Sequence, residues 1–169
     1  MRIREAMPAD SDAVRRVHAE SITVLGRDGY SREQVNAWAQ GCESADYSAA
    51  IGSESRYYIV AEDERGVLGF GSFQYESPEG YEATVDAEIT AVYVHPEVAR
   101  DGVGSKIYTE LERRAREKGI RVLGLSASLN AVPFYESHGY ERVREHAHEF
   151  SSHESTEVEG IVVEMKKTL

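Results

Sequence analysis

Hydrophobic positions along the chain alternate between a two-residue period and a helical period, and this alternation sets the predicted order of elements. The two-residue pattern and short apolar runs predict strands at residues 2–6, 57–62, 67–75, 84–94, 122–127, 143–150 and 158–165. The helical pattern predicts helices at 8–23, 31–41, 105–118 and 130–138, with a helical turn at 46–51. With one strand counted as broken in two, the order reads βααββββαβαββ, which is an α/β (α+β) arrangement.

Helix-boundary residues support several of these limits. Ser31 followed by Gln34 is the sequence of a capping box at the start of the second helix. Gly41 and Gly119 follow helical segments, and glycine is the preferred residue just beyond a helix C-terminus. We therefore expect the second helix to end at Gly41 and Cys42 to lie in a loop.

The strand at 84–94 has an irregular hydrophobic pattern. Ile89, Val92 and Val94 are its core candidates, yet strict alternation would place residues 89 and 92 on opposite faces. A β-bulge between them shifts the phase by one residue and would return all three to one face. A strand buried on both faces would explain the same pattern, so both interpretations stay open at this point.

The turn after this strand has the properties of an anion site. Gly102 and Gly104 carry no Cβ, so the backbone there can approach a ligand closely. The first N–H groups of the following helix have no internal partner, and the helix dipole favours negative charge beside them. The turn therefore predicts a phosphate-binding site.

Two common phosphate motifs fit this turn poorly. A P-loop needs a glycine five residues before its Gly-Lys-Ser/Thr end, but here Ser105 follows Gly104 and the upstream position is Ala99. The dinucleotide fingerprint needs a third glycine or alanine where this chain has Ile107. A different family of phosphate loops has to be considered.

The segment resembles the pyrophosphate loop of the GCN5-related N-acetyltransferase (GNAT) superfamily, Gln/Arg-x-x-Gly-x-Gly/Ala after a strand that ends in Val-x-Pro. Here Val94-His95-Pro96 precedes the loop, and Ala99 replaces the leading Gln/Arg. Backbone N–H groups supply most of the grip in this family, and Arg100 supplies a nearby charge. The resemblance implies that coenzyme A is contacted by Val92, Tyr93, Val94, Ala99, Arg100, Asp101, Gly102, Val103, Gly104 and Ser105.

A second segment, Asn130 to Tyr140, resembles the family's Asn-x-x-Ala/Pro-x-x-Phe-Tyr-Glu-x-x-Gly-Phe/Tyr motif. The resemblance implies that Asn130 hydrogen-bonds the pantetheine arm, that Pro133 belongs to the same contact, and that Tyr135 lies beside the sulfur. A tyrosine O–H within ~3 Å can protonate a departing thiolate. A core aromatic on a short helix is the alternative for Tyr135.

The resemblance covers nearly the whole chain and implies the GNAT fold. That fold is a mixed, mostly antiparallel, twisted sheet of about seven strands with helices on both faces. A bulge splays the central parallel strands into a V-shaped gap for the pantetheine arm, which favours the bulge in the 84–94 strand. The backbone N–H near Val94 would then point at the thioester carbonyl.

Glu88 precedes the expected bulge, where many members of the family place a carboxylate. It would accept a proton from the incoming amine, directly or through a water, and burial would raise its pKa toward a useful range. A substrate-ammonium anchor and a solvent-facing strand residue are the alternatives. Asp86 is the neighbouring candidate.

Four further residues are candidates for contact with the acceptor substrate. Tyr30 and Trp38 belong to a segment resembling the Tyr-Ser-x-x-Gln-x-x-x-Trp-Ala pattern of one subgroup of the family, where this region roofs the acceptor pocket. Packing of Trp38 against the sheet is the competing interpretation. Thr90 lies on the bulged strand, and His146 lies on a closing strand.

Histidine and cysteine content argues against a metal centre. His146, His148 and His153 are close in sequence, but no acidic ligand at a characteristic spacing accompanies them. Cys42 is the only cysteine, so neither an intrachain disulfide nor a cysteine zinc cluster can form. We expect no metal.

Composition narrows the class of partner. The chain has 169 residues, the length of one ordinary domain, so we expect a single N-acetyltransferase domain over 1–169. Its net charge of −11 opposes nonspecific binding to nucleic acid. No apolar run suits a membrane span and no signal-peptide core is present, so a cytoplasmic location is expected. The Glu-rich, Lys-poor composition fits a halophilic source and an ordinary acidic soluble protein equally well.

Together these features predict an N-acetyltransferase that uses acetyl-CoA as acyl donor. A primary amine of a small molecule or peptide would attack the thioester directly in a ternary complex. The alternative is a catalytically weak CoA-binding sensor or interaction protein, which the Ala99 departure keeps open. The acceptor's identity is not encoded in these patterns, and homodimers are common in the family.

Overall fold

The computed structural model describes residues 1–150 and 158–169. The strands are β1 (Arg2–Glu5), β2 (Arg56–Asp63), β3 (Gly66–Gln74), β4 (Ala87–Val94), β5 (Val122–Ser128), β6 (Glu141–Glu149) and β7 (Glu159–Thr168). The α-helices are α1 (Ser11–Leu25), α2 (Arg32–Ser44), α3 (Tyr47–Ile51), α4 (Val103–Glu117) and α5 (Val132–Ser137). Short 3₁₀ turns cover Pro8–Asp10, Gly26–Asp28 and Pro96–Val98.

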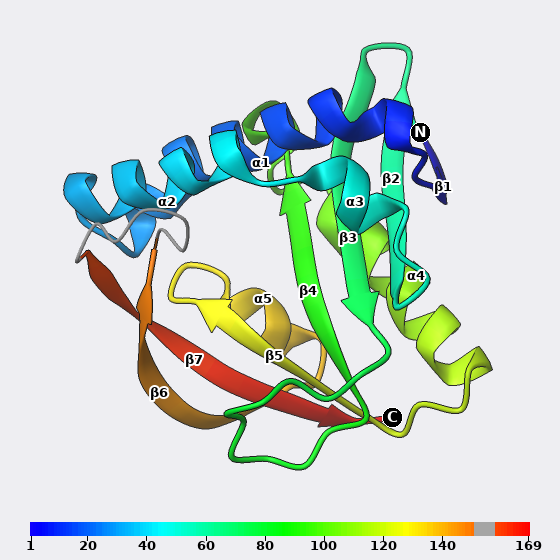
Figure 1. The fold of residues 1–169 in the computed structure, drawn as a ribbon, viewed down its shortest axis with the longest axis vertical. Coiled ribbons are helices and arrows are strands. Elements are labelled where there is room, and N and C mark those ends of the chain that lie inside the picture. The colour runs from blue at the N-terminus through cyan, green and yellow to red at the C-terminus, as the bar shows by residue number, and fades with distance from the viewer. Residues whose placement is uncertain (151–157) are drawn as a thin grey trace.

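The seven strands form one sheet in the order β1-β2-β3-β4-β5-β7-β6 (Figure 1). Only β4 and β5 pair in parallel among these strands, and the other five neighbouring pairs are antiparallel. The expected mixed, mostly antiparallel sheet is confirmed. Between the N-terminal helices and α4 the structure has three strands, β2, β3 and β4, where the predicted order counted four, because none of them is broken in two.

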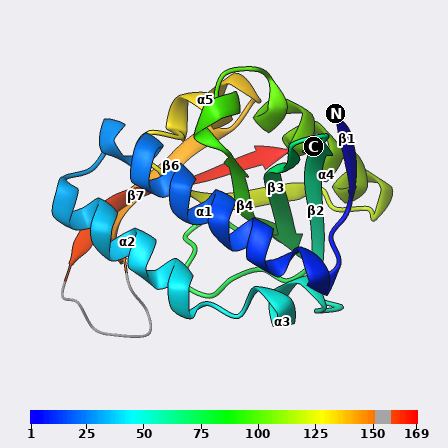
Figure 2. The same cartoon turned by 90° about the horizontal axis from the view of Figure 1, so that it is seen from above.

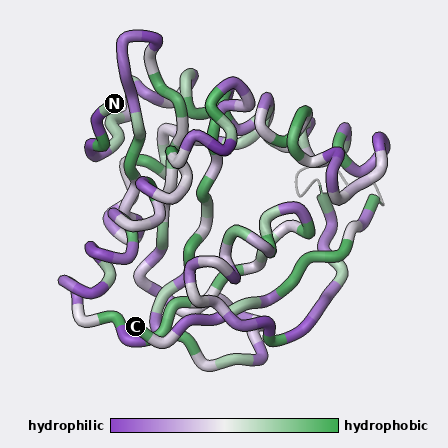
Figure 3. The backbone as a smooth tube through the Cα atoms, turned by 180° about the vertical axis from the view of Figure 1, so that it is seen from behind, coloured by the Kyte–Doolittle hydropathy of each residue, from purple (hydrophilic) through white to green (hydrophobic). Residues whose placement is uncertain are grey.

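Helices cover both faces of the sheet (Figure 2). On one face, α1 and α3 pack on β2 and β3 through a cluster that includes Val14, Val17 and Phe70. On the other, α4 and α5 pack through a larger cluster around Ile107 and Leu111. Hydrophobic stretches follow the strands between these layers, whereas the β2–β3 turn is hydrophilic (Figure 3).

The predicted bulge lies in β4. Ser72 of β3 pairs with Ala91, but the next residue, Phe73, pairs with Ile89, so Thr90 is the extra residue. Phe73, Gly71 and Gly69 alternate along β3 and share a face, and their partners are Ile89, Val92 and Val94. These three residues therefore face the α4 side together, as the irregular pattern predicted.

β4 and β5 separate soon after they meet. Their pairing consists of Ala87 with Leu123 and Glu88 with Gly124, at the start of both strands. Beyond the bulge the two strands diverge, which leaves a V-shaped opening between their C-terminal halves (Figure 1). The expected splay of the central parallel strands is confirmed.

Two sequence-based limits are wrong, and both errors have a tertiary cause. Helix α2 runs through Gly41 to Ser44, so Cys42 is a buried helical residue instead of a loop residue. A glycine inside a helix costs about 1 kcal/mol, which burial of the next turn offsets. The strand expected from Thr84 begins at Ala87, because the Asp86 carboxylate accepts hydrogen bonds from the N–H groups of Arg121 and Val122.

No helix in the described ranges combines the length and the apolar character that a membrane crossing requires.

Candidate functional site

Two cavities open on either side of the splayed strands. The first, here called the donor pocket, lies between the C-terminal halves of β4 and β5, the α1–α2 corner and α5. It is lined by Ser21, Ile22, Leu25, Gly26, Trp38, Val92, Tyr93, Val94, Gly104, Ser128, Asn130, Ala131, Phe134 and Tyr135.

The second cavity, here called the acceptor pocket, lies below α2 and reaches the closing strands. Its lining residues are Trp38, Glu88, Ile89, Thr90, Tyr93, Ser126, Ser128, His148, Phe150 and Val162. Trp38, Tyr93 and Ser128 line both cavities. Two ligands held in the two pockets would therefore meet beside β4.

The turn before α4 has the backbone shape of an anion-binding loop. Gly102 is the N-cap of α4 in the left-handed region with φ 85°, and Arg100 also has a positive φ of 69°. Left-handed residues next to helical ones turn successive N–H groups toward a common point. A Cβ on Gly104 would lie 3.4 Å from the ring of Phe134 and 3.6 Å from Val94, so glycine keeps this wall of the donor pocket open.

The N–H of Val94 points into the opening between β4 and β5. The next residue, His95, donates its N–H to the carbonyl oxygen of Leu68 at 2.7 Å, on the β3 side. Successive N–H groups of a strand point to opposite edges, so that of Val94 points toward β5, where pairing has ended. A donor in this position suits an acyl carbonyl oxygen on which charge develops.

Asn130 and Tyr135 contribute polar side chains to the lining of the donor pocket. The Oδ1 atom of Asn130 is buried and accepts no hydrogen bond from the described residues. A buried acceptor of this kind is costly unless a ligand N–H satisfies it, and the amides of a pantetheine arm carry such groups. Tyr135 is 7% exposed, and burial raises the pKa of its phenol, which keeps the proton in place. These residues fit coenzyme A.

Glu88 is the carboxylate of the acceptor pocket. Its Oε1 accepts a hydrogen bond from Gln74 Nε2 at 2.8 Å, and its Oε2 accepts one from the Tyr81 hydroxyl. Burial raises the pKa of Glu88, while the Tyr81 hydrogen bond and the charge of Arg56 oppose the rise. A carboxylate whose pKa is raised is a better proton acceptor near neutral pH.

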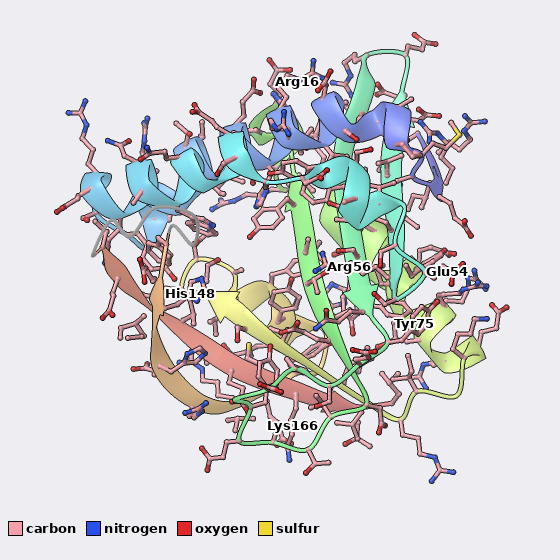
Figure 4. The ribbon with its side chains drawn as sticks, in the orientation of Figure 1. Arg16, Glu54, Arg56, Tyr75, His148 and Lys166 are labelled. Carbon is pink, nitrogen blue, oxygen red and sulfur yellow. The ribbon has the colours of Figure 1, made fainter. Side chains whose placement is uncertain are left out.

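Aromatic side chains form the rest of the acceptor pocket wall. Trp38 stacks on Phe150 with ring centroids 5.4 Å apart, and Tyr93 lies edge-on to Trp38 at 6.5 Å. His148 of β6 lies beside Phe150 and is labelled in Figure 4. Trp38 therefore packs against Phe150 and lines both pockets, while its contact with the acceptor stays a prediction.

The structure places two acceptor candidates away from this pocket's wall. Tyr30 is buried, donates its hydroxyl to the carbonyl oxygen of Ile161 at 2.7 Å and accepts the N–H of Leu129 at 2.9 Å. Its hydroxyl thus links the segment before α2 to β7 and to the end of β5. His146 contacts Ser126, at 3.4 Å from its Oγ, while its neighbour on the same face, His148, lines the pocket. Thr90 does line it, with its hydroxyl bonded to Ser72.

The donor candidates fall into two groups. Val92, Tyr93, Val94, Gly104, Asn130 and Tyr135 line the donor pocket. Ala99, Arg100, Asp101, Gly102, Val103 and Ser105 lie in or just after the turn that leads into α4, and Pro133 occupies the first turn of α5. Their individual contacts with a ligand stay predictions.

Several site residues escaped the sequence patterns. Tyr81 and Gln74 hold Glu88, and Ser126, Ser128, His148, Phe150 and Val162 line the acceptor pocket. Tyr81 lies in a loop with no hydrophobic period, and the closing-strand residues belong to no motif. Alternation did place His148 on the same strand face as His146, which is the one signal that could have found it.

Metal-ligating side chains do not gather in the described ranges. Within residues 1–150 and 158–169, no three His, Cys, Asp or Glu side chains are arranged to hold an ion. His153 lies outside the described residues, so the absence of a metal stays a prediction.

Comparison with known proteins identifies the family. The family described as acetyltransferase (GNAT) domain matches residues 27–169. The uncharacterized N-acetyltransferase YafP of Escherichia coli is 26% identical over 145 residues, covering 86% of this chain and 84% of its own length. The uncharacterized N-acetyltransferase YjcF of Bacillus subtilis is 29% identical over 111 residues, covering 66% and 74%.

Solved structures share the fold over the whole chain. A GCN5-related N-acetyltransferase from Rhodopseudomonas palustris superposes with a TM-score of 0.83 at 25% identity, covering 99% of this chain and 95% of its own. The PaiA N-acetyltransferase of Thermoplasma acidophilum, solved with coenzyme A, superposes with a TM-score of 0.76 at 18% identity, covering 99% and 98%. The chain therefore belongs to the GNAT acetyltransferase family and is an acyl-CoA-dependent acetyltransferase.

Proposed function

We propose that this enzyme transfers the acetyl group of acetyl-CoA to a primary amine of a small molecule or peptide by direct attack in a ternary complex. The observation that carries the proposal is the pair of pockets that share Trp38, Tyr93 and Ser128. Both substrates can be present at once, so no acyl group has to be stored on the protein between them.

Acetyl-CoA supplies an activated acetyl group in the form of a thioester. The turn before α4 and the α4 N-terminus would bind its pyrophosphate, and Asn130 Oδ1 would accept an amide N–H of its pantetheine arm. The Val94 N–H would hydrogen-bond the acyl oxygen as negative charge develops there. Tyr135, protonated because burial raises its pKa, would donate its proton to the leaving sulfur.

Glu88 would take the proton that the amine loses. Burial raises its pKa, which makes it a better proton acceptor near neutral pH, and it lines the acceptor pocket. The stacked Trp38 and Phe150 rings would hold the body of the acceptor. The alternative is that Glu88 only anchors a substrate ammonium. Neutralising Glu88 would then raise the amine KM with little change in kcat.

The test is thiol release from acetyl-CoA across a panel of polyamines, amino acids, aminoglycosides and peptides. We expect amine-dependent release with at least one class. If coenzyme A binds tightly while every amine gives only background release, the chain is a sensor that retains the ligand site, and the enzymatic proposal fails.

Two variants test the assigned roles. Tyr135→Phe should lower kcat about 100-fold with a near-normal acetyl-CoA KM, because only the proton donor is lost. Glu88→Gln should lower kcat by a similar factor and remove the acid limb of the pH profile. Tyr75→Phe is the matched control, since Tyr75 packs on Phe73 at 5.1 Å and lines neither pocket. Unchanged turnover in Tyr135→Phe would remove this residue from the mechanism.

A further inference from the structure

The loop between β3 and β4, residues 75–86, inserts a tyrosine into the acceptor side of the site. The Tyr81 hydroxyl donates to Glu88 Oε2, so the loop supplies one of the two side-chain hydrogen bonds that orient this carboxylate. No pattern in the sequence pointed to this residue.

A row of paired residues across the sheet explains why the tyrosine fits there. Arg56, Gln74, Glu88, Gly124 and Lys166 are successive cross-strand partners on β2, β3, β4, β5 and β7. Arg56 and Lys166 of this row are labelled in Figure 4. Partners in register project to the same face, so Gln74 flanks Glu88 on one side and a glycine flanks it on the other.

The missing side chain at Gly124 is what admits the Tyr81 ring. A Cβ at this position would lie 3.1 Å from Tyr81 Cε2 and 2.7 Å from Val85 Cγ1. Any larger residue would push the loop away from the sheet. The tyrosine therefore occupies a space that β5 leaves open directly beside the carboxylate.

The loop itself is fastened to the closing strands. Glu164 of β7, whose side chain is fully buried, accepts the N–H groups of Glu82 and Ala83, both at 3.0 Å. Arg144 of β6 bonds Glu164 at 3.0 Å and donates to the carbonyl oxygen of Gly80. Two strands thus hold the loop immediately on either side of Tyr81, which gives its hydroxyl a defined position.

A chain of polar atoms continues from Tyr81 toward the sheet edge. Ser126 donates its hydroxyl to the Tyr81 oxygen at 3.2 Å, and Ser126 Oγ lies 3.4 Å from His146 Nε2. Ser126 is exposed and His146 half-buried, so this chain ends at solvent on the β6 side. This chain of polar atoms does not pass through Trp38, Tyr93 or Ser128, the residues that line both pockets.

We propose that Tyr81 is a positioning residue for Glu88 and that Tyr81, Ser126 and His146 form the path by which the acceptor's proton leaves the site. This inference rests on the proposed function of Glu88 as proton acceptor. With both substrates in place, the acceptor mouth is filled, and a route through the closing strands lets Glu88 return to its ionised form.

The proton balance is complete within these groups. The ammonium N–H bond breaks as Glu88 Oε2 gains the proton. Once Glu88 is protonated, the Tyr81 hydroxyl turns from Glu88 to Ser126, and the Ser126 hydroxyl turns from Tyr81 to His146. Glu88 then gives its proton to the Tyr81 oxygen, Tyr81 gives its own proton to Ser126, and Ser126 gives its proton to His146 Nε2. One N–H or O–H bond forms for each that breaks, the transfer leaves both hydroxyls pointing toward Glu88 as before, and the imidazolium loses its proton to water. Burial and the neighbouring Glu88 raise the pKa of Tyr81, so the path carries protons through a neutral phenol.

Burial raises the pKa of Glu88, and Tyr81 from the loop and Arg56 from β2 oppose the rise. The other titratable groups around the same pocket are Tyr93 from β4 and His148 from β6, with His146 reached through Ser126. The Tyr81 hydrogen bond favours the carboxylate form. Its removal should therefore raise the pKa of Glu88, and the sign of this shift is the signature of positioning.

The first experiment does not depend on turnover. Glutamate ¹³C-carboxyl NMR, with Glu88 assigned by the Glu88→Gln variant, follows the titration in the intact protein. Tyr81→Phe should raise the Glu88 midpoint by about one pH unit, the value of one hydrogen bond to a charged group. Tyr75→Phe should leave it unchanged. An unshifted midpoint in folded Tyr81→Phe overturns the positioning role.

The same titration also tests the proposed proton path through Tyr81, Ser126 and His146. Protonation of Glu88 should move the ¹⁵N signals of the His146 ring in the wild-type protein and in Tyr75→Phe, but not in Ser126→Ala. If His146 senses Glu88 equally well without the serine hydroxyl, the path is wrong. Circular dichroism of each variant confirms that the fold is retained.

Kinetics provide the second reading. Tyr81→Phe should move the acid limb of kcat/KM upward by the same amount as the NMR midpoint. His146→Ala should lower kcat about tenfold at an unchanged acetyl-CoA KM, and added imidazole should restore part of it while leaving the wild-type rate unchanged. Full activity in both Ser126→Ala and His146→Ala overturns the exit path. Absence of turnover in the wild type instead rejects the proposed function, and the NMR result still decides the role of Tyr81.

Discussion

The donor side and the acceptor side of this enzyme are built in different ways. The donor pocket also draws on α1, α2 and β4, but the segments proposed to bind coenzyme A, the turn before α4 and the start of α5, are short and contiguous, and their backbone shape follows from their own residues. The acceptor pocket draws Trp38, Glu88, Ser126 and Phe150 from four distant parts of the chain. Glu164 and Arg144 must dock a loop before Tyr81 can reach Glu88. The proposed coenzyme A contacts therefore depend mainly on local backbone geometry, whereas the surroundings of Glu88 depend on long-range packing.

The largest effect is expected at Glu164, which holds the 75–86 loop on β7. Glu164→Ala should lower the free energy of unfolding by about 3 kcal/mol, because it leaves two N–H groups and Arg144 without their buried partner. It should also lower kcat more than acetyl-CoA affinity, since Tyr81 loses its support. Urea denaturation and isothermal titration with acetyl-CoA measure the two quantities. Equal losses on both sides of the site would erase the distinction.

The anchor also predicts a pH dependence of stability. Burial opposes ionisation of Glu164, but the Ala83 and Glu82 N–H groups and Arg144 outweigh it and hold the pKa below its ordinary value. A carboxylate with a lowered folded-state pKa stabilises the protein above its unfolded pKa, and this contribution is lost as pH falls through the folded value. The stability gap between wild type and Glu164→Ala should narrow below about pH 4.

An intermediate effect is expected at Tyr30, which lies near both pockets but lines neither. Tyr30→Phe should lower the free energy of unfolding by about 2 kcal/mol, since it removes the hydroxyl shared by Ile161 and Leu129. Steady-state kinetics should show an amine KM within about twofold of wild type. A tenfold rise in that KM would restore Tyr30 as a substrate contact and move the boundary of the acceptor pocket.

The smallest effect is expected for Asn130, which lines the donor pocket. Asn130→Ala should raise the acetyl-CoA KM about tenfold, or about 1.4 kcal/mol, while the melting temperature stays level or rises slightly. The reason is that Asn130 Oδ1 has no partner among the described residues, so the free protein loses no hydrogen bond there. A large fall in melting temperature would mean that this side, too, depends on distant packing.

Features that depend on neighbouring residues were predicted from the sequence more successfully than features that depend on distant ones. The spacing of Ile89, Val92 and Val94 allowed either a bulge or a strand buried on both faces, and the family resemblance favoured the bulge that the structure has at Thr90. The end of α2 was predicted wrongly, because Gly41 signals a stop that burial of Cys42 overrides. Tyr81 left no mark at all. Its role depends on a glycine 43 positions later in the sequence and on a carboxylate on β7.

By itself, the sequence determined the order of elements and the two motifs of the donor side, because periodicity and turn chemistry act over a few neighbouring residues. Only the tertiary structure decided which side chains surround Glu88. Hydrogen bonds such as Gln74 to Glu88 and Ser126 to Tyr81 join residues whose proximity depends on strand order and register. Those are properties of the folded sheet, and they determine the surroundings of the carboxylate that we propose accepts the acceptor's proton.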